Sequence, residues 1–252
     1  MPQELFIDEQ SYVTDIVTAD YRTADVFRKY DIEFCCGGRW PLKTACEVRG
    51  LDLELITREL KSVTRVIQLS PQLQFAQWPL DFLADYIVNI HHAFIKELLP
   101  QVKDHLDRFA EGHRKKYPYL TELQSLFDRL LHNLRPHLQQ EEEVIFPYIK
   151  QIHRAYMNND SYASLLVRTL RKPVEALIDH EHATMGKALQ QFRELTGHYK
   201  APPNACISHR VTFSKLLEMD LDLTQHIHLE NDVLFPRAIA IEKELLQRNG
   251  GL

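Results

Sequence analysis

The chain has 252 residues, of which 44% are hydrophobic and 26% are charged, and its formal net charge is −5. This composition is typical of a folded protein with one large domain, or with a small domain joined to a medium one, and it excludes a mainly disordered chain. A weakly negative chain has no excess of Lys and Arg for nucleic acid or an anionic bilayer, so neither partner is expected.

The sequence also predicts a cytoplasmic protein. No run of eighteen apolar residues occurs, and the first residues lack the basic and apolar parts of a secretory signal. The low glycine count of eight argues against a β-rich fold with many tight turns.

The N-terminal part predicts a small helical domain. From about Tyr12 to Leu60 the pattern is that of short helices, interrupted by Phe34-Cys35-Cys36-Gly37-Gly38, where two glycines favour a turn beside adjacent thiols. Residues 68–77 lose helical periodicity, and Trp78-Pro79 begins a new element. We therefore predict a small domain over residues 1–70 and a second domain over residues 78–252.

The sequence of the second domain predicts an antiparallel four-helix bundle, so the expected fold is all-α. Four long helical segments can be read at residues 80–111, 118–154, 161–197 and 205–246. Proline lacks the backbone N–H that a helix interior needs, so it should bend or interrupt a helix. Five prolines fall inside these segments: Pro100, Pro136, Pro147, Pro173 and Pro236.

One motif occurs twice in the bundle. It has the form His-x₃-Glu-x₂-Val-Φ-Phe-Pro, with Φ being Ile or Leu, at residues 137–147 and again at residues 226–236, a constant offset of 89. Residues four apart lie on one face of a helix, so each copy directs an imidazole and a carboxylate to the same point. A single His-x₃-Glu pair is usually a surface pair, but two copies in register indicate a metal site.

The duplication extends to the other two helices, because His92-Ala93 matches His182-Ala183 at an offset of 182 − 92 = 90. Six ligands are thereby predicted: His92, His137, Glu141, His182, His226 and Glu230. Four histidines with two bridging carboxylates suit two irons, each with two histidines, although the donors also fit manganese or zinc. The apolar residues after each Glu, at 144–146 and 233–235, are expected to pack as a dry wall.

The other histidines are weaker candidates. His91, His180 and His228 point away from the ligand face by helical phase, and His113, near the end of the first segment, is the second-tier candidate. Five histidines have no counterpart in the other half: His105, His132, His153, His198 and His209. Glu142 and Glu143 align with Asn231 and Asp232, so they fail the duplication test and are interpreted as solvated charges.

These features resemble the hemerythrin-like di-iron proteins of the Repair of Iron Centers (RIC, or ScdA-type) group. The N-terminal similarity lies in Phe-Arg-Lys-Tyr-Asp-Ile-Glu-Phe-Cys-Cys-Gly-Gly at residues 27–38, and the C-terminal similarity lies in the two His-x₃-Glu copies with Phe-Pro. The resemblance implies iron ligands at the same six positions, with Glu141 and Glu230 bridging two iron ions in a non-haem centre that can carry an oxo bridge.

The resemblance also implies a stress-response function: the repair of iron–sulfur clusters damaged by nitric oxide or oxidants, by supplying iron to the damaged client proteins. The family is associated with nitric oxide reduction too, so enzyme status stays open. Two alternatives are a hemerythrin-like sensor or carrier of O₂ or NO and a ferritin-like iron store, the latter disfavoured because such sites are richer in carboxylate.

The adjacent thiols of Cys35 and Cys36 could bind a metal, form a redox pair or accept iron. The resemblance favours a redox or iron-transfer role over ligation of the di-iron centre. An exposed Cys-Cys domain also leaves a homodimer open. Cys46 and Cys206 are expected to be structural, since small buried thiols are common.

Overall fold

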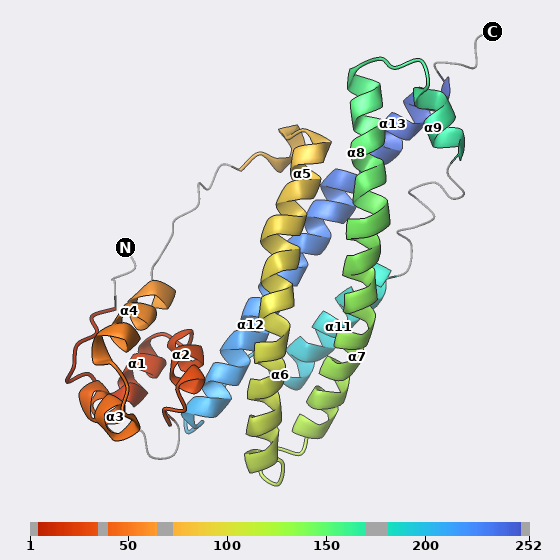
Figure 1. Ribbon diagram of the computed structural model, residues 1–252. Coiled ribbons are helices and arrows are strands. Elements are labelled where there is room, and N and C mark those ends of the chain that lie inside the picture. The colour runs from red at the N-terminus through yellow and green to blue at the C-terminus, as the bar shows by residue number, and fades with distance from the viewer. Residues whose placement is uncertain (1–4, 35–39, 65–72, 170–180, 248–252) are drawn as a thin grey trace. The chain divides into compact units, whose positions relative to one another are not determined.

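The computed structural model describes residues 5–34, 40–64, 73–169 and 181–247 (Figure 1). Every regular element in these ranges is helical, and Tyr12 and Pro41 add one isolated β-bridge. The predicted all-α fold is therefore confirmed. The chain forms two compact units: unit 1 comprises Met1–Pro71, Gln101–Pro118 and Thr196–Glu218, and unit 2 comprises Gln72–Pro100, Tyr119–Leu195 and Met219–Leu252.

Unit 1 contains four short N-terminal helices: α1 (Val13–Ala19), α2 (Thr23–Lys29), α3 (Leu42–Arg49) and α4 (Leu53–Thr64). Their apolar faces enclose one core, in which Phe27, Leu42 and Leu60 are fully buried. Helix α3 ends at Gly50, whose φ of 65° is the left-handed conformation that glycine adopts at little cost. The same core includes Val211, so the beginning of α12 (Ile207–His228) belongs to this unit.

A buried polar cluster adds specific contacts in unit 1. Asp25 accepts a hydrogen bond of 2.9 Å from Nε2 of His105 and pairs with Nζ of Lys215. The Lys215 ammonium, whose residue is only 2% exposed, also donates to Oε1 of Gln101 at 3.0 Å. Burial alone would raise the pKa of Asp25, but the hydrogen bond from His105 and the charge of Lys215 lower that pKa below its usual value.

Unit 2 contains the helical segments that carry the predicted ligands. The first segment is α5 (Leu80–Tyr86), a π-helical turn η2 (Ile87–His92) and the beginning of α6 (Ala93–His113). The second is α7 (Leu120–Gln140), π-turn η3 (Glu141–Ile145) and α8 (Phe146–Met157). The third includes α9 (Ala163–Thr169) and α11 (Glu181–Leu195), and the fourth is the end of α12, π-turn η4 (Leu229–Leu234) and α13 (Phe235–Gln247).

The segments run in alternate directions within unit 2, as Figure 1 shows, and this arrangement is the predicted four-helix bundle. Helix α11 packs on α7, while α8 packs on α5 and α13. A short 3₁₀ turn, η1 (Phe75–Gln77), precedes α5. The predicted segment ends lie within three residues of the observed ones wherever the structure describes them; residues 170–180 of the third segment lie outside the described residues.

The prolines occupy two kinds of position. Helix α6 continues through Pro100 and α7 continues through Pro136, so neither residue interrupts its helix, and the alternative of a bend there stays a prediction. A single missing donor is tolerated there, because the flanking turns keep their own hydrogen bonds. Pro147 and Pro236 each follow a π-turn as the second residue of the next helix, where a missing N–H costs little. Pro173 lies outside the described residues.

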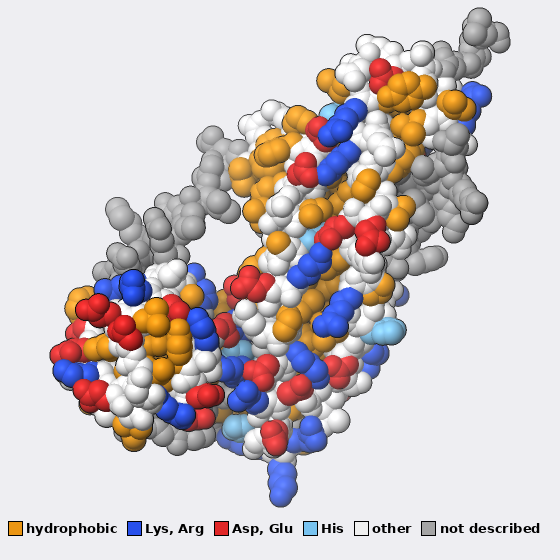
Figure 2. Space-filling view, viewed as in Figure 1, with side chains coloured by type: hydrophobic (Ala, Val, Ile, Leu, Met, Phe, Trp, Pro, Cys, Tyr) orange, Lys and Arg blue, Asp and Glu red, His pale blue; other side chains and the backbone are white. Residues whose placement is uncertain are grey.

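In the described ranges, no helix combines the length and apolar character needed to cross a bilayer. The face of the molecule in Figure 2 carries acidic and basic side chains interspersed along the helices, with hydrophobic side chains between them. Ion pairs such as Lys96–Glu142 and Lys150–Asp85 contribute to this mixed surface of unit 2.

The buried cluster in unit 1 leads to a stability prediction. We expect Asp25→Ala to lower the free energy of unfolding by about 3–5 kcal/mol, because the buried Lys215 ammonium loses its carboxylate partner. Urea denaturation followed by circular dichroism measures this loss. The control is Glu9→Ala, whose carboxylate pairs with Lys43 at the exposed surface and should contribute about 1 kcal/mol or less. Equal losses in the two variants would contradict the prediction.

Candidate metal centre

Three of the six predicted ligands lie in π-helical turns of unit 2, and the other three lie in its α-helices. His92 is the last residue of η2, while Glu141 and Glu230 lie at the beginning of η3 and η4. His137 and His226 lie one helical turn before these glutamates, and His182 is in the first turn of α11. All six are buried, with at most 6% of each residue exposed.

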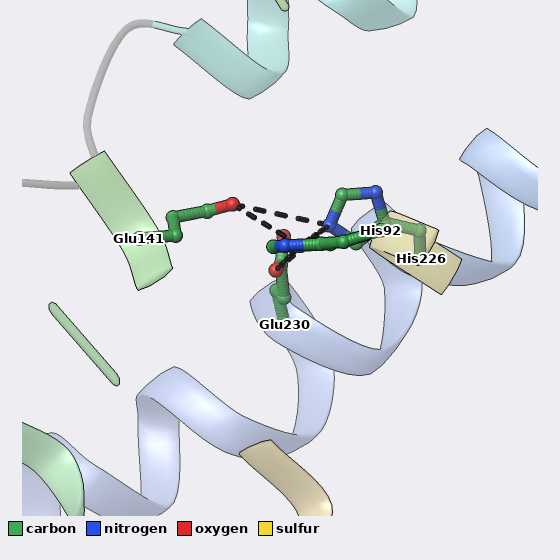
Figure 3. Close-up of side chains that lie close together, drawn as sticks. All are labelled: His92, Glu141, His226 and Glu230. Carbon is green, nitrogen blue, oxygen red and sulfur yellow. Dashed lines mark hydrogen bonds and ion pairs between the residues drawn. The ribbon is translucent and has the colours of Figure 1, made fainter. Parts of the chain in front are cut away.

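The six side chains form two groups, each able to hold one cation, and both glutamates belong to both groups. The first group, called the His92–His226 position below, consists of His92, Glu141, His226 and Glu230 (Figure 3). The second, called the His137–His182 position, consists of His137, Glu141, His182 and Glu230.

In the His92–His226 position the two Nε2 atoms are 3.1 Å apart. Nε2 of His226 is 2.8 Å from Oε1 of Glu230, and Nε2 of His92 is 3.5 Å from Oε2 of Glu141. Figure 3 shows the two rings and the two carboxylates turned toward one point. The position therefore offers two nitrogen and two oxygen ligand atoms.

The His137–His182 position repeats this arrangement. Its two Nε2 atoms are again 3.1 Å apart. Nε2 of His137 is 3.2 Å from Oε1 of Glu141, and Nε2 of His182 is 3.2 Å from Oε2 of Glu230. Each glutamate thus presents one oxygen to each position, which is the geometry of a carboxylate that bridges two cations.

The donor atoms fit transition-metal ions. Two metal–nitrogen bonds of about 2.1 Å that meet at a right angle place their nitrogens about 3.0 Å apart, close to the spacing in both positions. Buried polar atoms need partners, yet among the described residues Oε2 of Glu141 and Oε2 of Glu230 make no hydrogen bond of good geometry and face only imidazole nitrogens, at 3.5 Å and 3.2 Å. A cation in each position would satisfy both oxygens.

Burial and the neighbouring charges shift the pKa values of the side chains in the two positions. Burial and the neighbouring Glu230 carboxylate raise the pKa of Glu141 to about 7. Burial would also raise the pKa of Glu230, but the charge of His226 and the hydrogen bond from His182 lower it well below its usual value. Burial would lower the pKa of His182, but its hydrogen bonds to Glu141 and Glu230 raise it to about 10.

Glu142 corrects one sequence interpretation. Its Oε1 is 2.8 Å from Nδ1 of His92, and Lys96 donates to both of its oxygens at 2.7 Å. It is thus part of the site's support rather than a solvated charge. Asn231, its counterpart in the second copy, places Oδ1 2.7 Å from Nδ1 of His182. Glu143 is exposed and accepts a hydrogen bond from Gln139.

Aromatic rings pack against His92 and His182, the histidines on the first helix of each duplicated half. Phe146 stacks on His92 at a centroid distance of 5.6 Å, and Phe235 stacks on His182 at 5.9 Å. Both phenylalanines are at most 2% exposed, as the predicted dry wall requires. Val144 departs from that prediction because it is 54% exposed and faces away from the core.

The other histidines considered from the sequence do not belong to either group among the described residues. The Nδ1 atom of His91 is 2.8 Å from Asp222, and the His91 ring stacks on His226 at 6.1 Å. The second-tier candidate His113 lies in unit 1, where its Nε2 is 3.5 Å from Sγ of Cys206. His228 pairs with Asp232 at the surface. His180 lies outside the described residues.

The cysteines lie partly within and partly outside the described residues. Cys35 and Cys36, predicted to act in redox or iron transfer, lie outside the described residues. Cys46 is buried in the core of unit 1, and burial raises the pKa of its thiol. Cys206 is half-buried beside His113.

Two features of the site escaped the sequence interpretation. The π-turns are visible in the backbone, where the N–H of Phe146 bonds to the carbonyl of Glu141 and the N–H of Phe235 bonds to that of Glu230, five residues back in each case. Such turns are frequent at functional sites, and the repeated Phe-Pro was their signal. The histidine partners Glu142 and Asn231 were missed because their identities differ.

Comparison with known families accounts for both parts of the chain. Residues 9–64 match the model named ScdA_N, a domain of unknown function (DUF542). Residues 83–238, more than half of the chain, match the hemerythrin HHE cation binding domain. The second match spans both copies of the duplicated motif.

Relatives are similar along nearly their whole length. An iron–sulfur cluster repair protein ScdA from Staphylococcus haemolyticus (strain JCSC1435) is 29% identical over 229 residues, 91% of this chain and 98% of the relative. Two iron–sulfur cluster repair proteins YtfE, from Citrobacter koseri and from Escherichia coli O157:H7, are 32% and 30% identical over 88% of this chain and 93% of each relative. The chain therefore belongs to the Repair of Iron Centers family, in which an ScdA-type N-terminal domain precedes a hemerythrin-type cation-binding domain.

Proposed function

We propose that this chain repairs damaged iron–sulfur clusters by supplying iron from a di-iron centre. The proposed ligands are His92, His137, Glu141, His182, His226 and Glu230. The proposal depends on the two positions that share both carboxylates, because this set could hold two cations side by side with imidazole nitrogens and carboxylate oxygens. Similarity to cluster repair proteins over about nine-tenths of the chain supports the function.

The glutamates, the histidines and the two phenylalanines have different proposed roles in the centre. Glu141 and Glu230 hold the two positions together, since each presents one oxygen to each position. The imidazoles supply the remaining ligand atoms, while Phe146 covers His92 and Phe235 covers His182 and would keep water from these rings. Bound iron would supply cargo for a cluster and redox chemistry toward oxidants or nitric oxide. Each position offers four ligand atoms from the protein, so a bound ion of higher coordination number would keep exchangeable positions, and its transfer would need no unfolding of the bundle.

The ligand assignment predicts the metal content of variants. Protein produced in iron-replete cells should contain about two irons per chain, and Glu141→Gln or Glu230→Gln should lose most of this iron, because each change removes a ligand from both positions. Glu143→Gln, an exposed neighbour, is the matched control and should retain its iron. Metal analysis together with an optical spectrum measures the iron content of each variant. Zinc in place of iron, or unchanged iron in all three variants, would contradict the assignment.

Metal binding should also depend on pH in a defined direction. Hydrogen bonds to Glu141 and Glu230 raise the pKa of His182 to about 10, so the ring carries a proton at neutral pH, and ligation of a metal requires that this proton leave. Apparent affinity should therefore rise about tenfold per released proton and pH unit between pH 6 and 8. Chelator competition at several pH values measures this slope, and a slope of zero would oppose the predicted protonation of the site.

Cluster repair with a cysteine variant tests the function itself. The iron-loaded chain should restore activity to an iron–sulfur protein damaged by nitric oxide, and the double variant Cys35→Ala, Cys36→Ala should retain iron but repair several-fold more slowly. Cys46→Ala is the control, because that buried thiol has a raised pKa and is unreactive. Full repair by the double variant would remove the cysteines from the proposal. Multiple-turnover consumption of nitric oxide without repair would instead favour a reductase.

A further inference from the structure

The two metal positions differ in the partner of one ligand. His92 and His182 are equivalent residues of the duplicated halves, and each directs Nε2 at its metal position and Nδ1 at a side chain from the facing helix. For His92 that partner is the carboxylate of Glu142. For His182 it is the neutral amide oxygen of Asn231.

A carboxylate that accepts the Nδ1 proton of a ligating histidine makes the ring a stronger donor, and loss of such a partner typically weakens metal binding about 10–100-fold. Glu142 fits this role because its side chain is only 24% exposed, so bulk water screens it incompletely. Lys96 holds the carboxylate by donating to both oxygens, but the Lys96 side chain is 52% exposed and its charge is largely solvated. Asn231 is exposed and brings no charge.

Several other features of the two positions match, although Nδ1 of His226 has no hydrogen-bond partner among the described residues. The Nε2 pairs have the same separation, each position receives one oxygen from each glutamate, and each first-helix histidine lies against a phenylalanine. A difference in burial acts in the same direction as the charge: the side chains of His92 and His226 are fully buried, while those of His137 and His182 are 7% and 6% exposed.

We propose that the two positions hold iron unequally: the His92–His226 position retains its ion, and the His137–His182 position gives up its ion first. This inference rests on the proposed function and names the iron that is supplied. The departing ion leaves as Fe(II), its bonds to two Nε2 atoms and two carboxylate oxygens are replaced by bonds to the acceptor, and no electron is transferred. Glu142 and Asn231 act as positioning residues that set the difference.

Iron release to a ferrous chelator, under anaerobic and reducing conditions, tests the inference with the full-length iron-loaded chain. Wild type should release its iron in two phases of similar amplitude, with rates at least tenfold apart. Glu142→Gln keeps the hydrogen-bond acceptor but removes its charge, so it should accelerate the slow phase about tenfold or more. Asn231→Asp adds the missing charge and should slow the fast phase by a similar factor.

Mössbauer spectroscopy of ⁵⁷Fe-loaded wild type gives a second measurement that needs no variant. It should resolve two iron environments of equal area, and Glu142→Gln should bring their parameters together. Glu143→Gln is the control for adding a neutral side chain near this turn and should leave both phases unchanged. Single-phase release with one iron environment would overturn the inference, as would a Glu142→Gln effect on the fast phase alone. Two-phase release without cluster repair would instead contradict only the proposed function.

Discussion

The fold of unit 2 depends on one electrostatic constraint, the burial of two carboxylates side by side. Glu141 and Glu230 are 1% and 0% exposed, and two like charges at such a depth repel each other strongly without a cation between them. A protonated imidazole offsets part of this repulsion, which explains the raised pKa of His182 beside both glutamates. Two bound cations would balance the charge more completely, because every carboxylate oxygen would then face a positive centre.

The same arrangement joins the two halves of the duplicated bundle. His92 and His137 come from the first half, and His182 and His226 come from the second. Each metal position takes one histidine from each half, so neither helical hairpin alone completes a position. A bound ion would therefore crosslink α7 to α11 on one side and η2 to α12 on the other. Metal binding and packing of the halves would then be a single equilibrium, as is common where ligands come from separate elements.

The helices and the six side chains of the site could be predicted from the sequence, because periodicity reveals helices and the duplication reveals equivalent residues. Helical periodicity predicted the four helical segments, and the repeat selected, among thirteen histidines and many carboxylates, the six side chains that the structure brings together. Two details differ for physical reasons. Interruption was one of the two effects expected of the prolines, yet Pro100 lies within a helix whose neighbouring turns compensate for one missing donor. Glu142 was rejected because its counterpart is Asn231, although both side chains carry an oxygen acceptor at the same position.

The mismatch at residues 142 and 231 shows how a duplicated site can diverge without losing its geometry. A histidine that ligates through Nε2 needs an acceptor for its Nδ1 proton, and either a carboxylate or an amide oxygen meets that need. Position and distance are preserved, at 2.8 Å for Glu142 and 2.7 Å for Asn231. The charge of the acceptor differs between the two positions, and this charge alters how strongly the histidine donates to a metal ion. Two positions built from the same ligands can therefore differ in how firmly they hold an ion.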